Sequence, residues 1–320
     1  MSEVKAPAKF RVLVTDRFDD DSFASLIGQP MISPSKAMTP DLVDDHLSQI
    51  DALAIRSRTQ ITKELLERAP NLKIIVTATS GFDHIDLVAC AARNVAVMFT
   101  PTANAASTCE LTWGLLIAAS RKLLLASSHA QSSNWRREEL MGSQFCGKTL
   151  GIIGLGRIGS RMARVARAFG MTTLAHDPYK DDTYFLEHDC ARVPLDQIFS
   201  TSDVVTCHVP AGAETLHMIS RDHLKNAKPG LIFANTSRGS VVSEKCLNEA
   251  LDQKWISACG LDVFETEPLS MTSGLIGRPN VVLTPHIGAT TVEAFKAASQ
   301  EAADKIIAFA ERGMSSDSLP

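Results

Sequence analysis

Short apolar runs alternate with amphipathic segments along nearly the whole chain. The apolar runs are rich in β-branched residues and end in turns, as expected for buried strands of a parallel sheet. The predicted strands are 10–15, 52–55, 72–78, 95–98, 149–153, 171–175, 203–207, 231–235, 258–263 and 281–284. Strands that alternate with helices in this way predict an α/β fold, and a chain of 320 residues is long enough for two such domains.

The amphipathic segments are predicted to be helices, at 41–47, 63–68, 87–93, 158–169, 221–225, 244–251 and 291–312. Three of them follow good capping residues, namely Thr62, Ser220 and Ser243. A further segment, 105–125, is almost uncharged and apolar nearly all round. We expect a buried connecting helix there, with a subunit interface as the alternative for part of it. No element is predicted in the polar stretch 127–147.

One strand ends in a glycine-rich turn that is typical of dinucleotide-binding proteins. Residues 149–153 are followed by Gly154, Gly156 and Gly159, and a helical pattern comes next. The glycines allow a tight bend, close approach of the backbone to a pyrophosphate and close packing of helix on strand. Asp177, after the next strand, can accept hydrogen bonds from the adenosine ribose. A turn that binds nothing is the alternative, but the complete strand–turn–helix–strand–acid order favours a dinucleotide site.

Composition and charge argue against several classes of protein. A net charge of −4 and an isoelectric point near 6.1 give no electrostatic reason to bind nucleic acid or an anionic membrane. No apolar run is long enough for a bilayer, and the polar N-terminus predicts no secretory signal. The seven cysteines are odd in number and form no CxxC pair. We therefore expect a cytoplasmic protein with reduced thiols and no metal.

Three polar residues, Arg238, Glu267 and His286, follow three different strands. Parallel strands end at the same edge of a sheet, so these side chains are expected to lie together near the dinucleotide. A guanidinium can hold a carboxylate and a carbonyl oxygen, and histidine can exchange the proton of a hydroxyl near neutral pH. A carboxylate beside the histidine would raise its pKa. Each residue alone is more often structural or solvated, whereas the set indicates a catalytic site.

Four motifs resemble those of the D-isomer-specific 2-hydroxyacid dehydrogenases. They are the glycine turn with Asp177 and the segments 235–239, 261–268 and 284–289, in the order found in that family. The resemblance runs from about Phe10 to Arg312. It implies two Rossmann-like or flavodoxin-like parallel-sheet domains, an active-site cleft between the domains, and NAD as the cofactor.

The resemblance also implies roles for individual residues. Arg238 would bind the substrate, His286 would donate and accept the proton, and Glu267 would be the partner of His286. The backbone N–H groups of Ser80 and Gly81 would hold the substrate carboxylate. The residues implicated in NAD binding are Thr108, Gly154, Gly156, Arg157, Ile158, Gly159, Asp177, Val209, Thr236, Asp262 and Gly288.

Within the family, the segments 53–59 and 170–179 are similar to those of 3-phosphoglycerate dehydrogenases. That resemblance implies oxidation of D-3-phosphoglycerate to 3-phosphohydroxypyruvate, the first step of serine biosynthesis. Arg56 would then pair with the phosphate, the alternative being a solvated strand-end residue. The C-terminal regulatory domain of many such enzymes is not expected. A glyoxylate or hydroxypyruvate reductase is the second candidate, and an NAD-sensing corepressor with the same three polar residues is the third.

The order of the elements predicts discontinuous domains. The helix at 291–312 follows the last strand of the nucleotide sheet and should pack on the first domain. We expect a substrate-binding domain from 1–103 and 290–320 and an NAD-binding domain from 104–289. The expected partners are a small 2-hydroxy or 2-oxo acid and a second copy of the chain, in a homodimer formed through the nucleotide domain.

Overall fold

The computed structural model describes residues 9–37 and 44–313. The chain divides into two compact units. Unit 1 contains the residues up to Asn104 and those from Thr290 onward, and unit 2 runs from Ala105 to Ala289. Each unit is built on one parallel sheet, as the alternation of apolar runs and amphipathic segments predicts.

The sheet of unit 1 has five parallel strands in the order β2-β1-β3-β4-β5. The strands are β1 (Phe10–Val14), β2 (Ile32–Lys36), β3 (Ala52–Ile55), β4 (Ile74–Thr77) and β5 (Ala96–Phe99). The helices are α1 (Asp20–Ile27), α2 (Asp44–Leu47), α3 (Lys63–Arg68), α4 (Leu87–Ala92) and α12 (Val292–Arg312). The strand order reverses between β1 and β3: β2 lies on one side of β1, and β3 to β5 lie on the other. Sheets of this type bind ligands at such a position.

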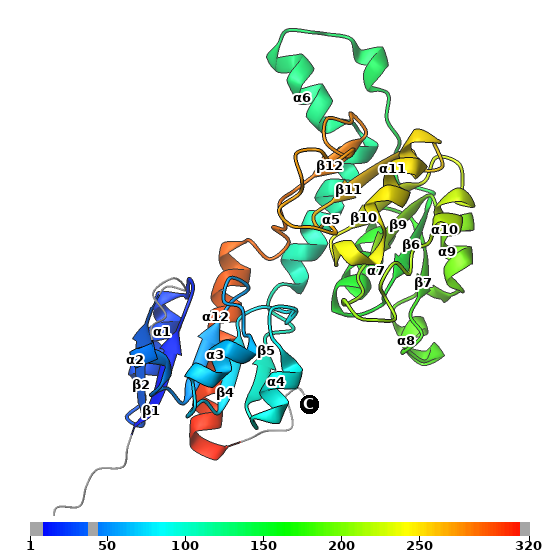
Figure 1. Cartoon of the computed structure of the whole chain (residues 1–320). Coiled ribbons are helices and arrows are strands. Elements are labelled where there is room, and N and C mark those ends of the chain that lie inside the picture. Colours follow the sequence, from blue (N-terminus) through cyan, green and yellow to red (C-terminus); the bar gives the residue numbers. More distant parts are fainter. Residues whose placement is uncertain (1–8, 38–43, 314–320) are drawn as a thin grey trace, which may run out of the picture. The chain divides into compact units, whose positions relative to one another are not determined.

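Successive side chains of each strand point to opposite faces of this sheet. Val12 and Val14 lie in a core with Ile306 of α12, whereas Leu13 packs on the other side with Leu66 of α3. Because both faces are covered, the strands are apolar throughout rather than alternating. Figure 1 shows α12, the red helix, lying along the sheet although it is the last element of the chain.

The sheet of unit 2 has seven parallel strands in the order β12-β11-β10-β9-β6-β7-β8. They are β6 (Thr149–Ile153), β7 (Thr172–His176), β8 (Ala191–Arg192), β9 (Val204–Cys207), β10 (Ile232–Asn235), β11 (Ala258–Leu261) and β12 (Val281–Leu283). The order reverses between β6 and β9, which places the glycine turn after β6 at the usual ligand-binding edge.

Helices cover both faces of this second sheet (Figure 1). On one face lie α5 (Ala105–Ser120) and α7 (Arg157–Ala168), and on the other α9 (Leu195–Thr201), α10 (Arg221–Lys225) and α11 (Glu244–Asp252). Most of α5 is buried, which confirms the expectation of a buried helix there. In unit 2 the described residues also form α6 (Leu123–Gln131), α8 (Asp182–Glu187) and the short 3₁₀ turns Arg137–Leu140 and Gly239–Val241.

The predicted helix at 105–125 is wrong in its extent. It ends at Ser120 because Lys122 adopts a left-handed conformation (φ 50°) and the Ser120 carbonyl accepts a hydrogen bond from the Ser143 N–H. A separate helix, α6, follows, and the stretch 127–147 contains its end and a 3₁₀ turn. Apolar pattern alone does not report such a break, since Leu123–Leu125 continue the apolar run.

Several short elements were not predicted at all. They are α1, β2, β8, α8 and α9. Strand β2 contains Pro34 and is mostly polar, which is tolerated because β2 lies at an edge of its sheet. Helix α1 begins with Asp20 and Asp21 and is capped by Asp19. The sequence therefore marks this helix by its capping residue and not by an apolar stripe. Of the predicted helix 41–47, residues 41–43 lie outside the described part of the chain.

Most cysteines pack as small apolar residues within the two cores. Cys207 and Cys259 lie in β9 and β11, and burial raises the pKa of Cys207 to about 11 and that of Cys259 to about 12. Cys90, Cys109 and Cys190 are also buried, and Cys146 is exposed. The described cysteines form no disulfide.

Candidate active site

The glycine turn has the geometry that dinucleotide binding requires. Gly154 has φ +88°, and a Cβ there would lie 2.7 Å from the His208 carbonyl oxygen. A Cβ on Gly159 would lie 2.1 Å from the Gly154 oxygen, so α7 can pack this closely only with glycine. At Gly156, in contrast, the space that a Cβ would fill is open. The turn therefore leaves room for a phosphate at the N-terminus of α7, and the exposed Arg157 begins that helix.

Asp177 follows β7 and is fastened to the glycine turn. The Leu155 N–H donates to its Oδ2 (3.0 Å), and the Tyr179 N–H donates to its Oδ1 (3.0 Å). These bonds fix a negative charge beside the turn, where the sequence analysis expected an acceptor for the ribose. The position fits a dinucleotide without a 2′-phosphate.

The other residues implicated in NAD binding lie at the same edge of the unit 2 sheet. Val209 follows β9, and its side chain would contact a Cβ on Gly154. Thr108 and Thr236 are buried and are linked through Thr112, whose hydroxyl donates to the Thr108 carbonyl and lies 2.8 Å from the Thr236 hydroxyl. Ile158 packs on the core beneath α7.

Asp262 is buried, and its carboxylate holds the segment that carries His286. Its Oδ1 accepts from the Thr284 hydroxyl (2.6 Å) and the Ile287 N–H (2.8 Å), and its Oδ2 accepts from the Gly288 N–H (2.8 Å). Gly288 is buried against Asp262 and Thr108. Asp262 was predicted to bind the cofactor; its structural task could not be predicted, because it depends on backbone groups of a distant segment.

His286 and Glu267 lie together after β12 and β11. Nδ1 of His286 is 2.7 Å from Oε2 of Glu267, and the Phe264 N–H donates to the other carboxylate oxygen (3.1 Å). His286 has a left-handed backbone (φ 53°), which the hydrogen bond from its own N–H to the Asp262 carbonyl supports. Both side chains remain accessible, at 49% and 36% exposed. The pair is therefore oriented and open to a ligand.

The charges of this pair stabilise one another. The hydrogen bond to Glu267 raises the pKa of His286, against the opposing effects of partial burial and of the Arg238 charge. For Glu267, partial burial alone would raise the pKa, but the hydrogen bonds from His286 and the Phe264 N–H outweigh it and lower the pKa. An imidazolium–carboxylate pair is thus favoured near neutral pH.

Arg238 follows β10 and lies close enough for its charge to act on both members of the pair. Its Nη1 donates to the Ser237 carbonyl (2.7 Å). Asn235 shapes the turn: its amide donates to the Arg238 carbonyl (2.8 Å), and its oxygen accepts from the Ser237 N–H (3.0 Å). The structure thus brings together the three polar residues that the sequence placed at three strand ends.

In unit 1, Ser80 and Gly81 form a half-buried turn after β4. The Thr79 hydroxyl donates to the Gly81 carbonyl (2.7 Å), and the Asn104 amide donates to the Ser80 hydroxyl (2.9 Å). Neither backbone N–H of this turn finds an acceptor among the described residues. The two N–H groups are therefore available to an anion such as a carboxylate.

Arg56 follows β3, and its guanidinium lies over the ring of Phe295, 5.0 Å from the centroid. The guanidinium of Arg17 lies over the same ring at 5.9 Å. Nη1 of Arg56 is buried and has no acceptor among the described residues. Burial lowers the pKa of Arg56, and the charge of Arg17 acts in the same direction against that of Asp16. No sequence motif marks Arg17, and its place beside Arg56 depends on the folded unit.

Comparison with known proteins gives consistent matches over most of the chain. Residues 113–288 match the family model described as "D-isomer specific 2-hydroxyacid dehydrogenase, NAD binding domain". The chain is 37% identical over 310 residues to a hydroxypyruvate reductase of Thermotoga maritima, covering 96% of this chain and all of that protein. It is 34% identical over 302 residues to the D-3-phosphoglycerate dehydrogenase of Bacillus subtilis, covering 94% of this chain and 57% of that protein.

Among solved structures, a glyoxylate reductase from Paecilomyes thermophila matches with a TM-score of 0.88 and 27% identity, over 98% of this chain and 99% of that one. The parallel sheets, the glycine turn and the Arg–Glu–His set thus define an NAD-dependent oxidoreductase. The chain belongs to the D-isomer-specific 2-hydroxyacid dehydrogenase family. Its cofactor is NAD, and its substrate is a small 2-hydroxy or 2-oxo acid.

Within residues 9–37 and 44–313, no set of three or more His, Cys, Asp or Glu side chains is arranged to hold a metal ion. In the same part of the chain, no helix combines the length and the apolar character needed to cross a bilayer.

Proposed function

We propose that the protein interconverts D-3-phosphoglycerate and 3-phosphohydroxypyruvate. In this proposal unit 2 binds NAD, through the residues implicated above, and unit 1 supplies substrate contacts. The NAD cofactor, when bound, accepts the hydride in oxidation and supplies it in reduction. The chain itself must bind the acid, exchange one proton with its oxygen and orient the groups that do so.

His286 is proposed to exchange that proton. Its Nδ1 faces Glu267, which leaves Nε2 for the substrate oxygen. In oxidation, neutral Nε2 takes the proton of the 2-hydroxyl, and in reduction the imidazolium returns the proton to the 2-oxo oxygen. Glu267 stabilises the imidazolium that forms, and Arg238 offers its guanidinium to the carboxylate and the carbonyl oxygen of the acid.

Within unit 1, the Ser80 and Gly81 N–H groups are proposed to bind the substrate carboxylate. If these groups hold the carboxylate within unit 1, the Arg56 guanidinium of the same unit has no task with a monoanionic acid. A phosphate would supply the acceptor that the buried Nη1 of Arg56 lacks, and Arg17 adds a second positive charge nearby. This buried Nη1, which has no acceptor among the described residues, is the observation that carries the choice of a phosphorylated substrate.

A hydroxypyruvate or glyoxylate reductase is the second candidate. The 37% identity to the hydroxypyruvate reductase of Thermotoga maritima, over all of that protein, favours it. The same proton exchange and the same carboxylate contacts would serve either substrate. The two candidates differ in whether Arg56 binds a phosphate group of the substrate. The first would pair it with a phosphate.

A screen of NADH consumption distinguishes the candidates. Phosphohydroxypyruvate, hydroxypyruvate and glyoxylate are offered at equal concentrations, and kcat/KM is compared. We expect phosphohydroxypyruvate to be preferred by about tenfold or more, the value of one charged hydrogen bond. A preference for hydroxypyruvate or glyoxylate would establish the second candidate, and failure to reduce any of them would refute both.

We also propose a homodimer formed through unit 2. Helix α6 contains no buried residue, and large apolar side chains are exposed on it and in the segment that follows: Leu123, Leu124, Trp135 and Met141. An exposed apolar surface of this kind is typical of an interface. Analytical ultracentrifugation should show a dimer, and Leu124→Asp should shift it toward the monomer.

A further inference from the structure

The loop that joins β11 to β12 carries Glu267, and it is fastened to helix α11. Glu244, Asn248 and Asp252 are spaced four residues apart along α11 and therefore share one face of the helix. Glu244 accepts a hydrogen bond from the loop, and Asn248 and Asp252 accept hydrogen bonds from the Arg278 side chain at the end of the loop. The carboxylate that faces His286 is thus borne by a segment whose place is set by a helix outside the catalytic set.

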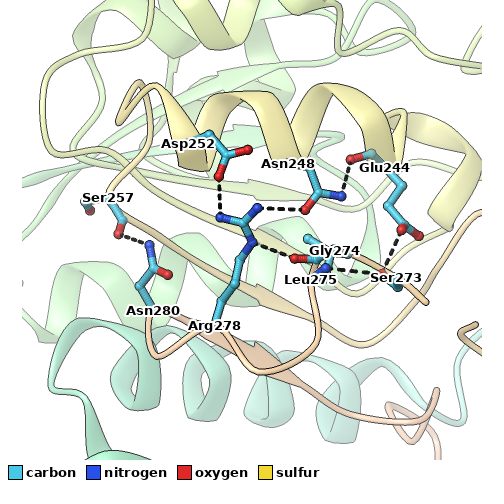
Figure 2. Close-up of polar contacts among 9 residues, drawn as sticks. All are labelled: Glu244, Asn248, Asp252, Ser257, Ser273, Gly274, Leu275, Arg278 and Asn280. Atoms are coloured by element: carbon cyan, nitrogen blue, oxygen red, sulfur yellow. Dashed lines mark hydrogen bonds and ion pairs between the residues drawn. The ribbon is translucent and has the colours of Figure 1, made fainter. Parts of the chain in front are cut away.

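Arg278 fastens the far end of the loop. Its guanidinium donates to Asp252 (2.8 Å), to the Asn248 amide oxygen (3.2 Å) and to the Gly274 carbonyl (2.6 Å), as Figure 2 shows. The Ser273 hydroxyl donates to Glu244 (2.7 Å) in the same view. This end lies several residues from Glu267.

Glu265 fastens the near end, two residues before Glu267. Its Oε2 accepts from the Glu244 N–H (2.5 Å), which is the first N–H of α11, and its Oε1 lies 2.8 Å from Nε2 of His217. Ser243 occupies the N-cap position of α11, as predicted, but its side chain makes no capping hydrogen bond. A carboxylate from another strand end accepts that bond instead, where the helix N-terminus favours negative charge.

Glycine allows the backbone beside Glu265 to lie against the Arg238 turn. A Cβ on Gly239 would be 1.9 Å from the Phe264 carbonyl carbon and 2.5 Å from the Glu265 nitrogen. The same turn is tied to His217, whose N–H donates to the Ser240 carbonyl (2.8 Å). Arg238, His217 and Glu265 therefore belong to one connected set of contacts. Phe264, which precedes Glu265, links this set to Glu267 because its N–H donates to the Glu267 carboxylate.

We propose that Glu265 is a positioning residue that holds Glu267 in register with His286. Without the contacts to the Glu244 N–H and His217, segment 264–268 would be free to move, and the 2.7 Å contact between Glu267 and His286 would loosen. A looser contact with Glu267 would lower the proton affinity of His286. Three charged groups act on this ring, namely Glu267, Arg238 and Asp262, and only Glu267 lies in the segment that Glu265 tethers.

The inference rests on the proposed role of His286, so its test includes a measurement that needs no turnover. Histidine labelled with ¹³C is titrated by NMR in the whole protein, and the His286 signal is assigned by its absence from His286→Asn. We expect Glu265→Ala to lower the pKa of His286 by about half a unit or more, because the ring loses part of its contact with Glu267. Glu265→Gln, which keeps an acceptor for the Glu244 N–H, should lower it less.

Two control variants separate positioning from the stability of α11. Glu249→Ala removes an ion pair between the same helix and Arg221 on α10 and should leave the His286 titration unchanged. Adding Ser243→Asp to Glu265→Ala supplies a local cap for α11 and should recover thermal stability without restoring the titration. If Glu265→Ala does not fold, the double variant takes its place.

Kinetics of hydroxypyruvate reduction give the second readout. For Glu265→Ala we expect kcat to fall about threefold to tenfold with KM for NADH within about twofold, since the glycine turn is untouched. An unchanged His286 titration in folded Glu265→Ala would refute the inference, as would its restoration by Ser243→Asp. If the wild-type protein reduces no 2-oxo acid, the proposed function fails, and the NMR titration still decides on Glu265.

Discussion

Nδ1 of His286 lies 2.7 Å from Oε2 of Glu267, and this contact raises the pKa of the histidine. Reduction of a 2-oxo acid needs protonated His286, so the rate is lost as pH rises through that pKa. Glu267→Gln removes the anion and lowers the pKa of His286 toward its ordinary value. The alkaline limb of kcat/KM for reduction should therefore move to lower pH. An unmoved limb would show that Glu267 does not set the titration.

His286 itself should be indispensable for turnover. Its backbone is left-handed (φ 53°), a conformation that asparagine tolerates better than most residues, so His286→Asn tests the ring with little strain. General acid–base catalysis contributes about 10²–10⁴-fold, and kcat should fall accordingly. NADH binding, followed by fluorescence, should be retained. Near-normal turnover in this variant would contradict the assignment.

Asp177 should make the enzyme prefer NAD over NADP. A 2′-phosphate beside this carboxylate would meet like charge, at a cost of about 1–4 kcal/mol in partly screened surroundings. Asp177→Asn removes the charge and keeps one acceptor oxygen, which can serve the Leu155 or the Tyr179 N–H but not both. The ratio of kcat/KM for NADH to that for NADPH should therefore fall by about tenfold or more. Equal use of both cofactors by the wild-type protein would rule out the role of Asp177.

Arg56→Ala should raise KM for phosphohydroxypyruvate by about tenfold or more, through loss of one charged hydrogen-bonding contact. Hydroxypyruvate lacks the phosphate and should be affected much less. Arg58→Ala, at an exposed position two residues on, is the matched control. An equal loss with both substrates would mean that Arg56 holds the common carboxylate or the fold, and the phosphorylated substrate would lose its main support.

Gly239→Ala should destabilise unit 2 and disturb Arg238. The added Cβ would overlap the Phe264 backbone, and overpacking of this kind costs about 1–3 kcal/mol or more. Thermal unfolding should show a melting temperature lower by several degrees. The control is Gly212→Ala, where the nearest atom would be 3.9 Å from the new Cβ. Equal stability of the two variants would show that the contact can relax.

The sequence predicted well those parts of the fold that local patterns determine. Strands covered on both faces, such as β6 and β9, are continuous apolar runs, and the glycine turn has a fixed spacing. Caps formed by a neighbouring side chain were also predictable: the Thr62 hydroxyl accepts from the Leu65 N–H, and the Ser220 hydroxyl accepts from the His223 N–H. These signals need only a few consecutive residues.

Features that depend on distant residues could not be predicted from the same patterns. The cap of α11 comes from Glu265, which lies 21 residues after Glu244, and Ser243 offered a plausible local alternative. The break between α5 and α6 depends on a hydrogen bond between Ser120 and Ser143. Arg17 follows β1, and only the folded unit shows that it shares Phe295 with Arg56. In each case the partner is chosen by the tertiary structure.

The distribution of the thiols makes unit 2 easy to label without mutagenesis. Thiolates, rather than thiols, attack maleimides, and burial holds Cys90, Cys109, Cys207 and Cys259 in the protonated form and out of reach. Cys146 is exposed and lies in the turn that leads into β6, the strand that Gly154 follows. A dye should attach there first, which would give a native fluorescent reporter in the same unit as the cofactor.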